Sequence, residues 1–251
     1  MNIYETWIAK NPIAHRGLFN EKCPENSLAA FKNAVKSKLP IELDVSLLTD
    51  GTPIVFHDER LARMTGKDGF ISNCTYKDIE KLTLLGTKEK IPTLAEALDV
   101  IDGKVPVLIE IKNYGKVGAF EKAIWKVLQG YSGDYAIESF NPYTLEWFKN
   151  NAPKVKRGQL SCFFKDKEIT GVKKFALKRM LLNKKISEPN FIVYCAEDMP
   201  NKYVRKYYGN LPILVYTIKN AEEENRLKEY CDNIIFDSYE PAVLSENKKS
   251  K

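Results

Sequence analysis

The chain has 251 residues, of which 44% are hydrophobic and 29% charged, enough apolar material for a packed core beneath a solvated surface. Its formal net charge of +6 comes from dispersed lysines without a recognisable reading element, so we expect no nucleic-acid partner. No run reaches the roughly 18 apolar residues of a membrane span, and the five cysteines form no CxxC pair, which argues against a disulfide framework or a cysteine zinc site.

The N-terminal segment MNIYETWIAKNPIAHRG lacks the charged start and apolar block of a secretory signal. We therefore expect a cytoplasmic protein without stable insertion in a membrane.

Apolar runs of strand length recur along the whole chain. They lie at residues 12–16, 41–45, 106–112, 135–140, 157–162, 191–195, 211–217 and 233–238. Helical patterns separate most of these runs, at residues 27–38, 93–101, 119–128, 141–151 and 220–230. Thr93 and Glu96 have the spacing of a capping box, and Asn141 and Asn220 are candidate N-caps.

Eight strands alternating with helices in a chain of this length predict an α/β fold, a (β/α)8 TIM barrel formed by one domain over residues 1–251. A doubly wound open sheet is the alternative, but no GxGxxG follows the first strand. Residues 58–90 break the rhythm after a possible hairpin arm, TPIVFH. They predict a small insertion after strand 2, within about residues 46–90.

Charged and titratable side chains gather at the predicted carboxyl ends of the first strands, where a barrel places its active site. The runs IELDV (41–45) and IEIK (109–112) carry apolar residues on one face and Glu42, Asp44 and Glu110 on the other. Three crowded carboxylates are costly unless a cation neutralises them, and oxygen ligands suit Mg2+, Ca2+ or Mn2+. The alternative is a structural charge network with Arg16 and Lys112.

The only two histidines, His15 and His57, fall at the same strand ends. Imidazoles are suited to proton transfer at neutral pH, while Arg16 and Lys112 could hold an anionic group such as a phosphate. A metal, two cations and two proton-transfer groups together indicate phosphoryl transfer.

Several linked motifs carry a family resemblance. They are AHRG (14–17), PENS (24–27), AF (30–31), ELDVSLLTDGTPIVFHD (42–58), LARMTG (61–66), IPTLAEAL (91–98) and IEIK (109–112), with weaker matches at SFNP, VYTIKN and NIIFDSYEP. In order and spacing the chain resembles the glycerophosphodiester phosphodiesterase family over nearly its whole length.

The resemblance implies a TIM barrel that hydrolyses glycerophosphodiesters to sn-glycerol 3-phosphate and an alcohol with one divalent cation, Mg2+ or Ca2+, with Mn2+ also possible. It places the metal on Glu42, Asp44 and Glu110. The acid/base pair falls on His15 and His57, and the phosphate ligands on Arg16 and Lys112.

Three further residues belong to this prediction with less defined roles. Glu25 could orient Arg16 or the metal ligands, or it could cap the helix that starts near Ser27. Phe140 and Tyr216 could line the pocket for the glycerol or alcohol group, or they could be ordinary barrel packing.

Two other functions stay open at this stage. One is a lysophospholipase D-like activity on lysolipids, and the other is a barrel that binds phosphodiesters without turnover. The sequence leaves undecided the preferred head group, the metal, the oligomeric state, and whether water or the substrate's own hydroxyl attacks phosphorus.

Overall fold

The computed structural model describes residues 2–165 and 170–241. The strands in this part of the chain are β1 (Ile13–Ala14), β2 (Ile41–Leu47), β3 (Pro53–Val55), β4 (Val107–Ile111), β5 (Tyr135–Ser139), β6 (Lys156–Ser161), β7 (Phe191–Cys195), β8 (Ile213–Ile218) and β9 (Asn233–Phe236).

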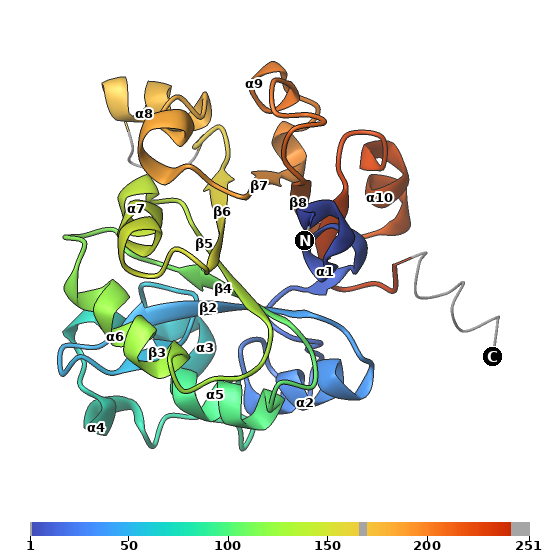
Figure 1. Ribbon diagram of the computed structural model, residues 1–251. Helices are drawn as coiled ribbons and strands as arrows, with labels where there is room; N and C mark the ends of the chain where they lie inside the picture. Colours follow the sequence, from blue (N-terminus) through green and yellow to red (C-terminus); the bar gives the residue numbers. More distant parts are fainter. Residues whose placement is uncertain (1, 166–169, 242–251) are drawn as a thin grey trace. The chain divides into compact units, whose positions relative to one another are not determined.

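Helices separate most of these strands (Figure 1). The α-helices are α1 (Trp7–Lys10), α2 (Leu28–Lys36), α3 (Ala62–Thr65), α4 (Tyr76–Ile79), α5 (Leu94–Ile101), α6 (Ala119–Leu128), α7 (Pro142–Asn151), α8 (Gly171–Lys178), α9 (Lys202–Arg205) and α10 (Ala221–Leu227). Single 3-10 or π turns are η1 (Ile3–Glu5), η2 (Ile71–Asn73), η3 (Asn183–Ser187) and η4 (Ala196–Asp198).

The strand order is β1-β9-β8-β7-β6-β5-β4-β2-β3, and β1 also pairs with β2. This is an eight-stranded parallel barrel with helices, to which β3 adds one antiparallel strand on β2. The predicted barrel is therefore confirmed, and the open doubly wound sheet is wrong. The hairpin arm expected at residues 52–57 is β3.

The contacts of the chain divide it into two compact units. One comprises residues 14–137, and the other comprises residues 1–13 together with 138–251. The expectation that residues 1–251 form one domain stays a prediction.

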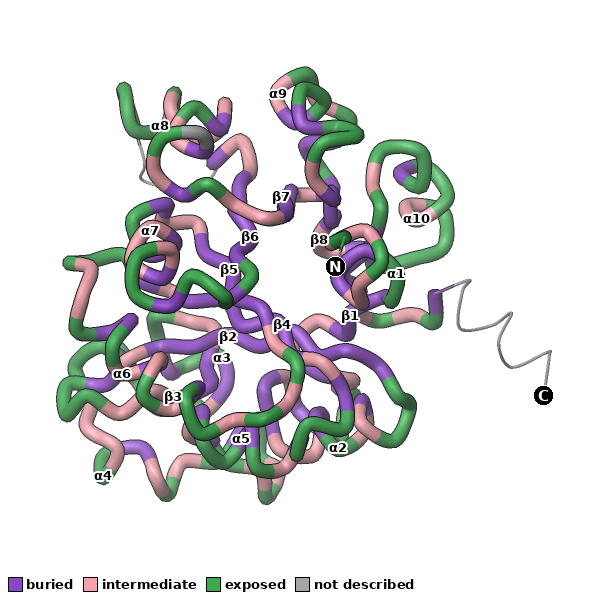
Figure 2. Tube along the Cα trace, in the orientation of Figure 1, coloured by how far each residue is buried: buried purple, intermediate pink, exposed green. Residues whose placement is uncertain are grey.

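In the unit of residues 14–137, β2 and β4 run parallel with Asp44 opposite Glu110. Both strands are buried along nearly all of their length, as Figure 2 shows. Helices α2 and α5 lie side by side in this unit (Figure 1). Both faces of IELDV are therefore closed to water: its apolar residues pack in the core, and Glu42 and Asp44 lie on a buried polar face.

The segment predicted as an insertion packs a small core of its own between β2 and α5. Its buried members are Leu48, Ile54, Phe56, Leu61, Met64, Ile71, Ile79, Leu84 and Ile91. This packing holds α3, which carries Arg63, and the turn after β3, which carries His57 and Asp58.

Local sequence signals begin the helices as expected. The Ser27 hydroxyl accepts from the Ala30 N–H at the start of α2, and Thr93 and Glu96 form a capping box at α5. Asn141 and Asn220 cap α7 and α10. Since Ser27 itself is the cap of α2, the alternative in which Glu25 caps this helix is wrong.

Candidate active site

The turn after β1 brings His15 and Arg16 against the start of β2. Arg16 and Gly17 both have left-handed backbones, with φ of 55° and 79°. The Arg16 N–H donates to Oε2 of Glu42 at 2.9 Å, and the Gly17 N–H donates to the Glu42 carbonyl at 3.2 Å. His15 Nε2 lies 4.0 Å from Oε2 of Glu42.

Three buried carboxylates meet on the polar face of β2 and β4. One oxygen each from Glu42, Asp44 and Glu110 lies within 4.8 Å of the other two. All three residues are at least about nine-tenths buried. This all-oxygen cluster could hold a divalent cation.

The ionisation of the three acids reflects their crowding. Burial, and then the neighbouring carboxylates of Asp44 and Glu110, raises the pKa of Glu42 well above its usual value. Burial and Asp44 likewise raise the pKa of Glu110, against the opposing charge of Lys112. Although burial acts in the other direction, Lys112, His57 and Arg16 hold the pKa of Asp44 below its usual range.

Two cationic side chains reach this cluster, but they do not neutralise it evenly. Lys112 Nζ is 3.0 Å from Glu110 and 3.3 Å from Asp44, and Arg16 Nε is 3.3 Å from Asp44. Within the described residues, no lysine or arginine side chain forms an ion pair with Glu42. The structural charge network therefore exists, yet it leaves one buried carboxylate for which a bound cation would be the natural partner.

A second network of ion pairs runs from Arg16 to His57 through three linking side chains. Arg16 Nη1 donates to Glu25 at 2.6 Å. Arg63, on α3, donates to Glu25 at 2.7 and 2.9 Å and to Asp58 at 2.6 and 2.9 Å. Asp58 in turn lies 2.7 Å from Nδ1 of His57. Glu25 therefore contacts Arg16 directly, and its predicted role in orienting Arg16 stays a prediction.

This network fixes the protonation of its members. Hydrogen bonds from Arg63 and His57 overcome burial and lower the pKa of Asp58 to about 2. Burial, with Lys112 and Arg16, lowers the pKa of His57 to about 4, although Asp44 acts against this shift. A neutral His57 beside an ionised Asp58 must carry its proton on Nδ1, so its Nε2 is an acceptor.

Three residues of the site had no role in the sequence-based prediction. Asn26 donates to Asp44 Oδ2 at 2.8 Å and accepts from its N–H at 3.3 Å. Asp58 and Arg63 hold His57 and Glu25. All three lie in the motifs PENS, HD and LARMTG that carry the resemblance, and this was the available signal.

The structure brings together eight of the ten predicted site residues in the unit of residues 14–137. Those residues are His15, Arg16, Glu25, Glu42, Asp44, His57, Glu110 and Lys112. Phe140 and Tyr216 belong to the other unit, where their rings form an edge-to-face pair with centroids 6.3 Å apart. Their role in a substrate pocket stays a prediction.

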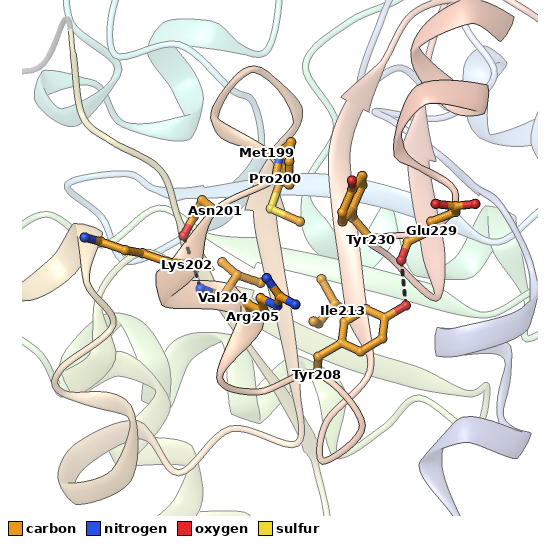
Figure 3. Close-up of a pocket in the computed structure, with 10 residues that line it drawn as sticks. All are labelled: Met199, Pro200, Asn201, Lys202, Val204, Arg205, Tyr208, Ile213, Glu229 and Tyr230. Carbon is orange, nitrogen blue, oxygen red and sulfur yellow. Dashed lines mark hydrogen bonds between the residues drawn. The ribbon is translucent and has the colours of Figure 1, made fainter.

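The unit of residues 1–13 and 138–251 has a cavity of about 590 Å3. Its lining includes Met199, Val204, Ile213, Tyr208 and Tyr230, and Figure 3 shows how they lie. None of the predicted site residues lines this cavity. Among the described helices, none is long and apolar enough to cross a bilayer.

Known proteins share this sequence pattern. A model of the glycerophosphoryl diester phosphodiesterase family matches residues 15–240. A glycerophosphodiester phosphodiesterase of Caldanaerobacter subterraneus is 42% identical over 161 aligned positions, which cover 59% of this chain and 65% of that protein, a little under two thirds of its length. A Bacillus subtilis protein of the same name is 27% identical over 262 aligned positions, gaps included, which cover 94% of this chain and 86% of that protein.

Solved structures have the same fold. An Oleispira antarctica phosphodiesterase in complex with the product sn-glycerol-3-phosphate superposes with a TM-score of 0.75 at 24% identity, over 90% of this chain and 92% of that one. A glycerophosphodiester phosphodiesterase from Thermotoga maritima gives 0.70 at 22% identity, over 96% and 98%. At these identities the likeness concerns the fold alone.

Proposed function

Because the chain belongs to the glycerophosphoryl diester phosphodiesterase family, whose members are phosphoric diester hydrolases, we propose that it cleaves glycerophosphodiesters to sn-glycerol 3-phosphate and an alcohol. The observation that carries the proposal is the cluster of Glu42, Asp44 and Glu110 in one compact unit with both histidines of the chain. A divalent cation would complete this site.

The carboxylates of Glu42, Asp44 and Glu110 would hold the cation, and they fit it because Glu42 is buried without an ion pair to any described lysine or arginine. When bound, such a cation polarises the phosphoryl oxygen and stabilises charge that develops on it. Arg16 and Lys112 would bind the remaining phosphate oxygens, since Arg16 is held by Glu25 and Lys112 projects between Asp44 and Glu110.

The histidines divide the two proton transfers. His57, with its Nδ1 proton directed at Asp58, would accept the nucleophile's proton at Nε2. His15, near Glu42, would donate a proton to the alcohol oxygen as its bond to phosphorus breaks. After these transfers His57 holds one extra proton and His15 lacks one. Both imidazoles return to their starting states when His57 releases its proton to solvent and His15 takes one up.

The proposal is tested with glycerophosphocholine and Mg2+, Ca2+ or Mn2+, following sn-glycerol 3-phosphate release. We expect His15→Asn and His57→Asn each to lower kcat about 100- to 10,000-fold, the range for a lost acid or base. Both variants should still bind the metal in a calorimetric titration, whereas Glu42→Gln should lose metal binding and activity together. Unchanged turnover in the histidine variants would refute their roles.

The identity of the nucleophile is measurable in the same reaction. If the substrate's own glycerol hydroxyl attacks phosphorus, a cyclic glycerophosphate should accumulate and then decay in a phosphorus NMR time course. If water attacks directly in H2(18)O, the label should enter glycerol 3-phosphate in one step without that intermediate.

The alternative substrate is a lysophospholipid with the same phosphodiester. Comparing kcat/KM for lysophosphatidylcholine and glycerophosphocholine separates the two, and we expect the deacylated diester to be preferred. Binding of the diester without turnover under all three metals would instead favour a non-catalytic barrel.

A further inference from the structure

Helix α8 exposes apolar side chains instead of burying them. None of its residues is buried, although Val172, Phe175 and Leu177 lie within its sequence. Val172 is 84% exposed and Phe175 46%, and Leu181, just beyond the helix, is 49% exposed. Short helices normally owe their stability to a packed apolar face, so three exposed large side chains between residues 172 and 181 indicate a surface that contacts something else.

Polar contacts, rather than packing of this apolar face, hold the end of α8 in place. The Ser161 hydroxyl donates to the Leu177 carbonyl at 2.9 Å, and the Tyr194 hydroxyl donates to the Lys178 carbonyl at 3.0 Å. Ser161 is the last residue of β6 and Tyr194 lies near the end of β7. The helix is therefore tied to the carboxyl ends of two strands through its main chain, which leaves Val172 uncovered. The Phe175 ring is 46% exposed and has the Arg179 guanidinium carbon 3.8 Å from its centroid.

A basic groove adjoins the same helix. It is lined by Lys165, Lys174, Lys178 and Lys202 together with Phe163, Pro200, Asn201 and Tyr203, and among the described residues no carboxylate is part of the lining. Lys165 pairs with Asp198 at 2.8 Å. For Lys174, Lys178 and Lys202, the described residues provide no ion-pair partner.

Lys202 lies between this groove and the neighbouring cavity, since it lines both. Figure 3 shows its amino group extending away from the other residues around that cavity. Positive charge is therefore left available on the groove side. The exposed apolar residues Val172, Phe175 and Leu181 with Lys174, Lys178 and Lys202 are here named the α8 patch.

We propose that the α8 patch binds the surface of an anionic lipid bilayer. Val172, Phe175 and Leu181 enter the boundary between head groups and acyl chains, and the lysines bind lipid phosphates. Both parts are needed for this interpretation: a nucleic acid or an acidic protein would explain the lysines but not the exposed valine, phenylalanine and leucine. The proposal concerns a surface contact and does not depend on the reaction proposed above.

The test is co-sedimentation of the purified full chain with vesicles. We expect binding to vesicles that mix phosphatidylglycerol and phosphatidylcholine, and little binding to phosphatidylcholine alone. Val172→Asp with Phe175→Asp should weaken the partition about tenfold or more, because two apolar side chains no longer enter the interface. Leu85→Asp is the matched control: this apolar residue is 56% exposed outside the α8 patch, and its variant should bind as the parent does.

The charge contribution is tested with paired lysine variants. Lys174→Gln with Lys178→Gln should lower binding by roughly tenfold and flatten its dependence on salt. Lys122→Gln with Lys126→Gln has the same spacing on α6, where both lysines are exposed, and should have little effect. All variants should keep the parent's melting temperature and its rate on soluble glycerophosphocholine, since these side chains lie on the surface.

Three results would overturn the proposal. The first is absence of binding to the anionic vesicles, and the second is equal binding to phosphatidylcholine vesicles. The third is loss of binding in the lysine variant while the Val172→Asp, Phe175→Asp variant binds as the parent does. The last result, with binding of poly(U) RNA, would identify the patch as a polyanion site instead. Because the vesicle assay involves no hydrolysis, an inactive enzyme would not affect its outcome.

Discussion

The guanidinium of Arg63 donates to two carboxylates that each hold another member of the site. Glu25 binds Arg16, and Asp58 binds Nδ1 of His57. Arg63 reaches both acids with four hydrogen bonds of 2.6 to 2.9 Å. Its planar fork can satisfy two carboxylates at fixed angles, so one side chain links the predicted phosphate ligand to the predicted base.

We expect Arg63→Ala to lower kcat/KM about 10- to 100-fold, the range for a residue that orients groups in contact with a metal or substrate. Arg63→Lys should recover only part of this, because an ammonium cannot reproduce the bidentate contacts to Glu25 and Asp58. Steady-state kinetics on glycerophosphocholine measure both variants.

The matched control is Arg60→Ala. Arg60 pairs with the exposed Asp68 at 2.8 Å and stacks on Phe70. An exposed pair of this kind contributes little to stability, and it touches no site residue, so activity should stay within about twofold of the parent. Equal losses at Arg60 and Arg63 would mean that the insertion as a whole, rather than Arg63, supports the site.

At the scale of residues the sequence predicted the candidate catalytic and binding side chains, but it did not predict the side chains that contact them. His57, Arg16 and the acids could be located because strand periodicity places residues on a face and strand ends place them at a rim. Arg63 is 38 residues from Glu25 along the chain. No periodic pattern states which long side chain will cross that distance, so its contacts required the folded structure.

Among the elements, β1 and the turn after it matter more than their length indicates. The predicted strand of residues 12–16 is only Ile13–Ala14, because Arg16 and Gly17 turn away with left-handed backbones. A Cβ on Gly17 would lie 2.9 Å from the Phe31 ring and 3.0 Å from the Ala30 backbone carbon. The turn therefore packs directly on α2, and this contact positions the Arg16 N–H toward Glu42.

Gly17→Ala should lower the free energy of unfolding by about 2–4 kcal/mol, since it adds both backbone strain and overlap with α2. It should also reduce activity beyond the loss of folded protein, because Arg16 would shift. Gly51→Ala isolates the backbone effect: φ there is 83° and nothing lies within 4 Å of an added Cβ.

Urea unfolding of the two variants makes the comparison. For Gly51→Ala we expect a loss of only about 1 kcal/mol and parental activity. If both alanines cost the same free energy, crowding at Gly17 contributes nothing and the turn can adjust without moving Arg16.

Helix α8 marks the limit of pattern reading at the scale of elements. The sequence-based prediction contained helices where an apolar stripe recurs, and α2, α5, α6, α7 and α10 bear this out. Between β6 and β7 it contained none, although Val172 and Phe175 have the i, i+3 spacing of one helix face. The sequence does not show whether such a face is buried, and the anchors of α8 are hydroxyl groups on other strands.

For the molecule as a whole, the count of strands and helices was enough to predict the barrel. Which residues close it was not predictable in the same way, since β1 contributes two residues and pairs with β2 through Ala14 and Ile41. The burial of the acids was equally hidden, because alternation distinguishes two faces of a strand but not water from a closed interior.

In the absence of a cation, the pKa values of Glu42 and Glu110 are raised by burial and by neighbouring acids. A carboxyl with a raised pKa in the folded state stabilises the fold at pH below its unfolded value, about 4.3, and this stability is lost as pH rises through the folded value. Asp44, whose pKa is lowered, stays ionised throughout this range and adds no such slope.

We therefore expect the melting temperature of the protein in EDTA to fall between pH 5 and pH 8, and Mg2+ to restore it more at pH 8 than at pH 5. At pH 5 the cation must displace protons from Glu42 and Glu110, whereas at pH 8 it relieves charge repulsion. Glu42→Gln should flatten the slope in EDTA and lose the response to Mg2+. Scanning calorimetry of the parent and the Glu42→Gln variant measures these melting temperatures. If Mg2+ raises both equally, the cation binds elsewhere and the three carboxylates are a structural network only.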